Sequence, residues 1–286
     1  MLGETRTFII CEFSQTHEGS LPLAKMLVKA AAGARADAVK IQIFAADELA
    51  VPSYNYYSLF QQLEWPEIQW RELIDYTHEL GLKFFADVFG TATLAMLVRN
   101  GVDGLKLHGT DMRNTRLLKA LADIDLPVLL SIGGGTLEET KRALSILNSK
   151  TRKSPIVLMH GFQSYPTLVE HTNLAKMRYF KDKLDLPIGF ADHIDGAHLL
   201  NFGLCAMAVG MGASVIEKHI TISRTLKMED YESALCPEDF VEFVVKVREL
   251  DSAKGKYSDE LIEVEAKYRA DTRKHVVAAA PVKAGS

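Results

Sequence analysis

The sequence predicts one (β/α)8 barrel, the α/β architecture that is also called a TIM barrel. Short apolar runs alternate with amphipathic segments along nearly the whole chain, which is typical of the strands and helices of a parallel sheet. The chain has 286 residues, and such a barrel typically needs about 250. No Gly-rich phosphate turn follows an early apolar run, and this disfavours an open doubly wound sheet.

Eight apolar runs are predicted to be strands. In chain order they are Phe8–Phe13, Ala38–Phe44, Leu82–Phe89, Gly104–Gly109, Pro127–Gly133, Ile156–Phe162, Pro187–His193 and Val215–Ile220. Repeated right-handed crossovers between parallel strands close the sheet on itself. We therefore expect the first and the eighth strand to be neighbours.

Five of the connecting segments carry helix signals. Leu21–Gly33 is Ala-rich with apolar residues on one face, and Pro66–Leu80 opens with the proline that suits a first helical turn. Thr136–Asn148 begins with Thr-Leu-Glu-Glu, which is a capping-box pattern. Asn201–Gly212 is small and apolar, and Pro237–Leu250 closes the series.

Two regions depart from the alternation. Ala45–Glu64 is a long connection that contains four aromatic residues, and long loops of this kind usually shape active sites. The end of the chain first has a helical pattern and then a strand-like one. We expect residues 1–255 to form the barrel and residues 256–286 to form a C-terminal helix and linker.

Composition excludes several classes of function. The net charge is -4, so no broad basic surface indicates nucleic-acid binding. No run of about 18 apolar residues lacks charge, which argues against a membrane span, and no cleavable signal segment opens the chain. The three cysteines form no paired framework, which is typical of a reducing compartment. We therefore expect a cytoplasmic protein.

The last two predicted strands carry two histidines. Catalytic groups of a barrel lie at the C-terminal ends of its strands, and His193 ends the seventh predicted strand. Glu217 and His219 alternate on the eighth, so their side chains share one face. A lone histidine is more often structural. Two imidazoles beside a carboxylate on adjacent strands suit a divalent ion such as manganese, iron, cobalt or zinc.

Further charged residues occur at strand positions where the interior of a barrel usually has apolar residues. Glu12 ends the first strand, next to the eighth, and is expected either to act as a base near the metal or to pair with a lysine. Lys40 and Gln42 share one face of the second strand, and Lys106 lies on the fourth. With Ser131 on the fifth strand, the two lysines predict a cradle for a carboxylate or a phosphate, or alternatively a Schiff base.

Two more positions complete the polar set. Asp87 on the third strand could neutralise one of the lysines, because a buried charge is costly unless it is paired. After the sixth strand, Gln163 and Tyr165 are expected at the rim of the barrel.

The motifs around these residues resemble the catalytic domain of the sialic acid synthase (N-acetylneuraminate synthase) family. The resemblance runs along nearly the whole chain. The motifs are Thr16-His-Glu-Gly-Ser20, Ala36-Asp-Ala-Val-Lys-Ile-Gln42, Leu130-Ser-Ile-Gly133, Ser164-Tyr-Pro-Thr167, Gly189-Phe-Ala-Asp-His193 and Val215-Ile-Glu-Lys-His-Ile-Thr221. Arg224-Thr225 and residues 230–233 extend the match.

The resemblance implies an enzyme that joins phosphoenolpyruvate to an aldehyde sugar such as N-acetylmannosamine, releases phosphate and forms a 2-keto-3-deoxy sugar acid. It implies Mn²⁺ as the metal, with His193 and His219 as its ligands. It implies that Glu12, Glu217 and Asp192 are the catalytic carboxylates. The residues expected to hold the substrates are Lys40, Gln42, Asp87, Lys106, Ser131, Gln163, Tyr165 and Asp230.

The chain departs from the family at the expected phosphate contacts. Ala86-Asp87-Val88 replaces Ser-Thr-Pro, Gly109 falls where a serine is usual, and Ala191 replaces the serine before Asp192. Gln163 stands where the family places Asn or Ser. Near the expected sugar site, Lys227-Met-Glu-Asp230 replaces Pro-Gly-Pro-Asp.

The family also carries a C-terminal antifreeze-like domain that reaches into a partner's barrel, so a homodimer is one expected state. We expect that domain to be truncated or absent in this sequence. Three hypotheses remain open: a synthase that uses phosphoenolpyruvate, a carbon–carbon lyase or transferase that uses an unphosphorylated keto acid, and a barrel retained for binding or regulation. In the second, Lys40 or Lys106 is the candidate for a Schiff base.

Overall fold

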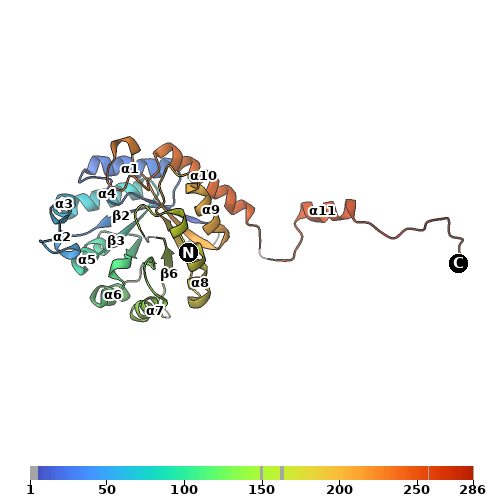
Figure 1. Cartoon of the computed structure of the whole chain (residues 1–286), viewed down its shortest axis with the longest axis horizontal. Coiled ribbons are helices and arrows are strands. Elements are labelled where there is room, and N and C mark those ends of the chain that lie inside the picture. The colour runs from blue at the N-terminus through green and yellow to red at the C-terminus, as the bar shows by residue number, and fades with distance from the viewer. Residues whose placement is uncertain (1–5, 149–150, 162–163, 257, 286) are drawn as a thin grey trace. The chain divides into compact units, whose positions relative to one another are not determined.

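The computed structural model describes residues 6–148, 151–161, 164–256 and 258–285. The chain divides into two compact units after Ala253. The first unit is a closed barrel in which each strand pairs in parallel with the next, and the eighth pairs with the first (Figure 1). The prediction of a (β/α)8 barrel is confirmed. The second unit contains the helix α11, Glu263–Thr272.

The strands are short and each predicted run overlaps one of them, although β8 begins two residues before its predicted run. They are β1 Phe8–Glu12, β2 Ala38–Ile43, β3 Lys83–Val88, β4 Gly104–Leu107, β5 Val128–Ser131, β6 Ile156–His160, β7 Ile188–Asp192 and β8 Ala213–His219. Most predicted runs extended past the strand ends. Flanking residues such as Ile132, which follows β5, stay fully buried although they lie outside the strand, so apolar composition does not mark where the strand ends.

The barrel helices form a ring around the sheet (Figure 1). Those of the first unit are α1 Leu21–Gly33, α2 Ala46–Leu49, α3 Tyr57–Leu63, α4 Glu67–Glu79, α5 Thr91–Arg99, α6 Thr115–Ala122, α7 Leu137–Ile146, α8 Leu174–Leu184, α9 Asn201–Gly210 and α10 Pro237–Ala253. Among the described helices, none is both long and apolar enough to cross a membrane.

Local sequence explains how several helices begin. Ser20 caps α1 by accepting a hydrogen bond from the Leu23 N–H, and Thr136 with Glu139 forms the predicted capping box of α7. The long connection after β2 contains α2 and α3. Glu48 of α2 accepts hydrogen bonds from the backbone N–H groups of Ala92 and Thr93, which ties this connection to the start of α5.

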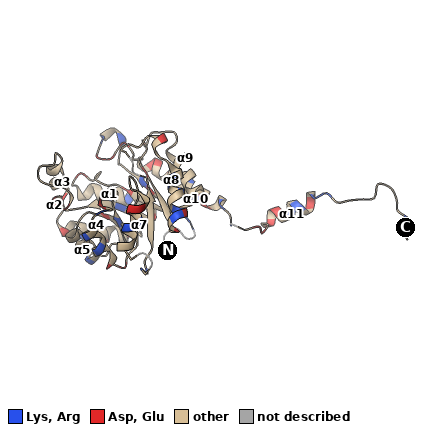
Figure 2. Cartoon of the chain, turned by 60° about the horizontal axis from the view of Figure 1, so that its bottom comes forward, with Lys and Arg blue, Asp and Glu red and all other residues tan. Residues whose placement is uncertain are grey.

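Most of the core lies in two layers that follow from the alternation of side chains along the strands, and Phe44, Leu63 and Phe89 form a small separate cluster. One layer fills the space between sheet and helices. The other fills the barrel below the site and consists of Ile10, Ala38, Phe85, Leu129, Val157, Met159, Ala191 and Val215. Charged residues of both signs are mixed over the helices of the ring (Figure 2).

Candidate active site

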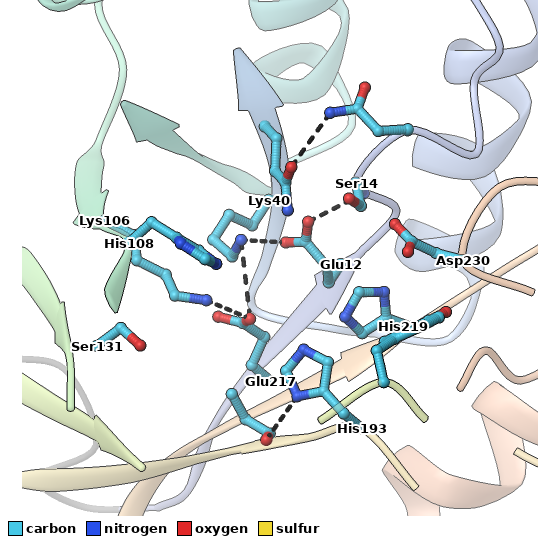
Figure 3. A pocket seen from close by; sticks show the side chains of 14 residues that line it. Glu12, Ser14, Lys40, Lys106, His108, Ser131, His193, Glu217, His219 and Asp230 are labelled. Carbon is cyan, nitrogen blue, oxygen red and sulfur yellow. Dashed lines mark hydrogen bonds and ion pairs between the residues drawn. The ribbon is translucent and has the colours of Figure 1, made fainter. Parts of the chain in front are cut away.

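Polar side chains at the C-terminal ends of the strands surround a cavity of about 190 Å³ (Figure 3). This is the end of a barrel at which catalytic groups are found. Most of the predicted site residues line it, namely Glu12, Lys40, Gln42, Lys106, Ser131, Tyr165, His193, Glu217, His219 and Asp230. They come from β1, β2, β4, β5, β8 and the loops after β6, β7 and β8.

A buried network of charges forms one wall of the cavity. The Lys40 ammonium lies 2.5 Å from a carboxylate oxygen of Glu12 and 3.7 Å from Glu217. It also donates a hydrogen bond to Asp87. The Lys106 ammonium donates to Glu217 at 2.6 Å and lies 4.0 Å from Asp87. Two lysines therefore share three carboxylates, and every member is buried.

The network sets the protonation state of its members. Burial alone would lower the pKa of Lys40, but the charges of Asp87, Glu12 and Glu217 raise it well above its usual value. Burial would raise the pKa of Asp87 and of Glu217, but Lys106 and Lys40 lower both. Burial raises the pKa of Glu12 to about 8. Near neutral pH Lys40 is therefore an ammonium, and Glu12 is the carboxyl group most ready to hold a proton.

The two histidines lie side by side, next to Glu12 and Glu217 of the network (Figure 3). Their ring centroids are 5.0 Å apart. Glu12 pairs with His219 in the β1–β8 register, which confirms that the first strand lies beside the eighth. Burial lowers the pKa of His193 to about 4 and lowers that of His219 well below its usual value. Both imidazoles are therefore neutral near pH 7, which is the form that binds metals.

These histidines fit a divalent ion. Neither ring nitrogen of His219 has a hydrogen-bond partner, although both are buried. The Nδ1 atom of His193 interacts with the carbonyl oxygen of Ala191 at 3.0 Å, the backbone contact that commonly orients a metal-binding imidazole. The described residues contain no group of three or more protein ligands. The chain would supply two imidazoles to an ion, and water or substrate would supply the rest.

Two predicted residues lie outside the cavity lining. Asp87 is fully buried beneath the lysines and neutralises Lys40, as one hypothesis held. Asp192 does not face the cavity, so its predicted role as a catalytic carboxylate is wrong in this geometry. It alternates with Ala191 and His193, which line the cavity, and its side chain pairs with Lys218 on the opposite face of the sheet. Gln163 lies outside the described residues.

Besides Ala191, three further lining residues were not predicted as site residues. Ser14 and Gln15 belong to the loop after β1, and His108 follows β4. His108 lies two residues after Lys106, so strand alternation could have revealed it. No comparable periodicity marks Ser14 and Gln15, because they lie in a loop.

The rim of the cavity carries Tyr165 and Asp230. Burial raises the pKa of the Tyr165 phenol, and the nearby charge of Asp230 raises it further. Burial also raises the pKa of Asp230. The loop that holds Asp230 is fixed by Arg224, which donates hydrogen bonds to the carbonyl oxygens of Tyr231, Glu232 and Ala234.

Residues 27–259 match the model of the NeuB family. The chain belongs to the NeuB family. This confirms the predicted resemblance, because relatives in the comparison are named as synthases of sialic acid and of related sugar acids.

Several relatives of this NeuB-family chain match most of its length. The N,N'-diacetyllegionaminic acid synthase of Legionella pneumophila is 32% identical, over 87% of this chain and 73% of the relative. The pseudaminic acid synthase of Campylobacter jejuni is 29% identical, over 88% and 76%. A crystal structure of N-acetylneuraminic acid synthetase from Leptospira borgpetersenii superposes with a TM-score of 0.85 and 32% identity, covering 94% of this chain and 93% of that one.

Proposed function

We propose that this NeuB-family barrel is a synthase of nonulosonic acid biosynthesis. It condenses phosphoenolpyruvate with an aldehyde sugar of the N-acetylmannosamine type, and it depends on a divalent metal held by its two imidazoles, for which the resemblance to the family implies Mn²⁺. One observation carries the proposal: two lysines, a serine and a tyrosine meet two neutral histidines in a single cavity. The names of the relatives, which are synthases of three different sugar acids, support the reaction class rather than one acceptor.

The lysines suit the donor. Phosphoenolpyruvate carries a carboxylate and a phosphate, and Lys40 and Lys106 present ammonium groups to the cavity with the Ser131 hydroxyl nearby (Figure 3). The net charge of the chain is -4, so the donor must be held by this local cradle rather than by a general field.

The histidines suit the acceptor. His193 and His219 would hold the ion, which when bound acts as a Lewis acid on the aldehyde oxygen. Glu12 is the register partner of His219 and has a pKa of about 8, so it can give a proton to the aldehyde oxygen or take one from the attacking water. Glu217 keeps Lys106 in place and is ionised.

The chemistry balances with one water. The C3 carbon of the donor forms a bond to the aldehyde carbon, and the aldehyde oxygen takes a proton to become a hydroxyl. Water adds at C2, phosphate leaves, and C2 becomes the ketone of the 2-keto-3-deoxy acid. The residues of the cavity bind, orient and move protons in this sequence, and the chain needs no redox cofactor for it.

Calorimetric titration of the Mn²⁺-loaded protein with phosphoenolpyruvate, beside pyruvate as control, tests the donor. We expect metal-dependent heat with phosphoenolpyruvate and little with pyruvate. Binding of pyruvate alone would refute the proposed donor.

A second candidate is favoured by Asp87. This carboxylate replaces a hydroxyl expected in the family, and Gly109 and Ala191 replace two more, so the phosphate loses contacts. An unphosphorylated 2-keto acid would suit such a pocket. The structure weakens a Schiff base at Lys40, because three carboxylates keep that amine protonated and therefore not nucleophilic. Borohydride trapping with pyruvate tests Lys106, and a covalent adduct there would favour this candidate.

A further inference from the structure

A buried ion pair lies directly behind the two histidines. Asp192 and Lys218 are partners in the β7–β8 register, and their charged atoms are 2.5 Å apart. Both side chains are completely buried on the face of the sheet opposite the cavity. Each precedes one of the cavity histidines in the sequence, His193 and His219. The pair is also the last ladder partnership before the two strands separate.

The Asp192 carboxylate joins three elements. One oxygen accepts a hydrogen bond from the Ile194 N–H at 3.2 Å. The carboxylate therefore links the residues before and after His193. The other accepts from Lys218 of β8 and from the Cys205 thiol of α9, the latter at 3.7 Å. These contacts link the point at which His193 leaves β7 to β8 and to α9.

Fold stability does not explain the pair. Replacing a buried ion pair with apolar residues of similar volume is often neutral or stabilising, because two charges have lost their water. The surroundings on α9 are small and apolar, with Ala208 and Val209 buried beside Cys205. An apolar pair would suit this place in the fold. The charges therefore indicate a role in positioning the ends of the two strands.

We propose that Asp192 and Lys218 are positioning residues that clasp the ends of β7 and β8 and hold His193 and His219 at the separation that a shared metal ion needs. The inference rests on the proposed metal site. Partners behind a metal ligand typically contribute about 10- to 100-fold to metal affinity. Asp192 thus supports the two histidines from the outer face of the sheet and does not act as a catalytic carboxylate.

The test compares full-length wild-type protein with the double variant Asp192→Leu/Lys218→Met. A matched control, Lys25→Met/Glu72→Leu, removes an ion pair between α1 and α4, away from the cavity. Mn²⁺ affinity is measured by electron paramagnetic resonance, and folding is measured by thermal unfolding. We expect the double variant to unfold no earlier than wild type yet to bind Mn²⁺ about 10- to 100-fold more weakly, while the control binds as wild type does.

Crystal structures of the metal-free proteins give a second readout. We expect the histidine ring centroids, 5.0 Å apart here, to shift by more than about 0.5 Å in the double variant. A stable double variant with wild-type affinity and wild-type ring separation would overturn the clasp. If wild type binds no Mn²⁺, the proposed metal site fails, and the ring separation alone decides the clasp. If the double variant does not fold, Asp192→Asn undergoes the same two measurements and the same outcomes apply.

Discussion

Asp87 is the residue at which this chain departs most sharply from the donor site expected of its family. Changing Asp87→Asn keeps the shape of the side chain and removes its charge. Lys40 stays paired, because Glu12 lies 2.5 Å away and Glu217 lies 3.7 Å away. Lys106 stays bonded to Glu217 at 2.6 Å. We therefore expect the variant to fold, with a free energy of unfolding lowered by about 1–3 kcal/mol for the altered hydrogen bond.

The gain in donor binding can be estimated from one distance. The Lys106 ammonium lies 4.0 Å from an Asp87 oxygen. At an effective dielectric constant near 20, this attraction is about 4 kcal/mol, and a phosphate that engages Lys106 competes with it. Asparagine removes the competition, but Glu217 still holds the lysine. We expect a net gain of about 1.4–2.8 kcal/mol, which is about 10- to 100-fold in the dissociation constant of phosphoenolpyruvate.

Calorimetric titration of wild type and of Asp87→Asn, each loaded with Mn²⁺, measures this difference. Pyruvate is the control ligand because it has the carboxylate but lacks the phosphate. Tighter binding of phosphoenolpyruvate with unchanged binding of pyruvate is the expected result. Unchanged binding of both would refute the reasoning. An equal gain for both would show that Asp87 opposes the carboxylate instead.

Three further predictions concern metal binding and stability. His219→Ala should abolish Mn²⁺ binding measured by electron paramagnetic resonance, while its circular dichroism spectrum stays that of a folded barrel. The control His78→Ala, at an exposed position, should change neither. Metal retention by His219→Ala would contradict the assignment of His219 as a ligand. Lys40→Met leaves the ionised Asp87 without its nearest cation and Glu12 without its partner, so urea unfolding should show a loss of about 3–5 kcal/mol. Lys25→Met at the partly exposed pair with Glu72 should cost less than about 1 kcal/mol, and equal losses would contradict the network. Burial lowers the pKa of His17 to about 4, below its unfolded value. Its contribution of about 3 kcal/mol to the free energy of unfolding is therefore present above pH 6.5 and is lost as the pH falls toward 4. The free energy of unfolding of His17→Phe in urea should depend less on pH over this range than that of wild type, and an equal slope would contradict this prediction.

The inward-facing residues were the most predictable part of the molecule. Alternation along a strand is a strict geometric rule, so Lys40 with Gln42 and Glu217 with His219 were correctly placed on shared faces. The same rule places Asp192 on the outer face, between Ala191 and His193. Its expected catalytic role came from the family resemblance, but in this chain the residue does not face the cavity.

The helices and loops were less predictable. The helices Thr91–Arg99, Thr115–Ala122 and Leu174–Leu184 were not among the five that local signals named. Such helices depend on packing against the sheet, and composition alone shows that weakly. The cavity contacts of Ser14 and Gln15 depend on how the loop after β1 folds back over the barrel, which no period in the sequence encodes.

Formation of the new carbon–carbon bond is the most direct test of the proposed function. Wild-type protein is incubated with Mn²⁺, phosphoenolpyruvate labelled with ¹³C at C3, and N-acetylmannosamine or a related amino-sugar aldehyde, and the labelled carbon is followed by NMR. We predict that the vinyl signal is replaced by the methylene signal of a 3-deoxy sugar acid, with one phosphate released per product. A vinyl signal that persists with every acceptor, while labelled pyruvate is incorporated, would contradict the account.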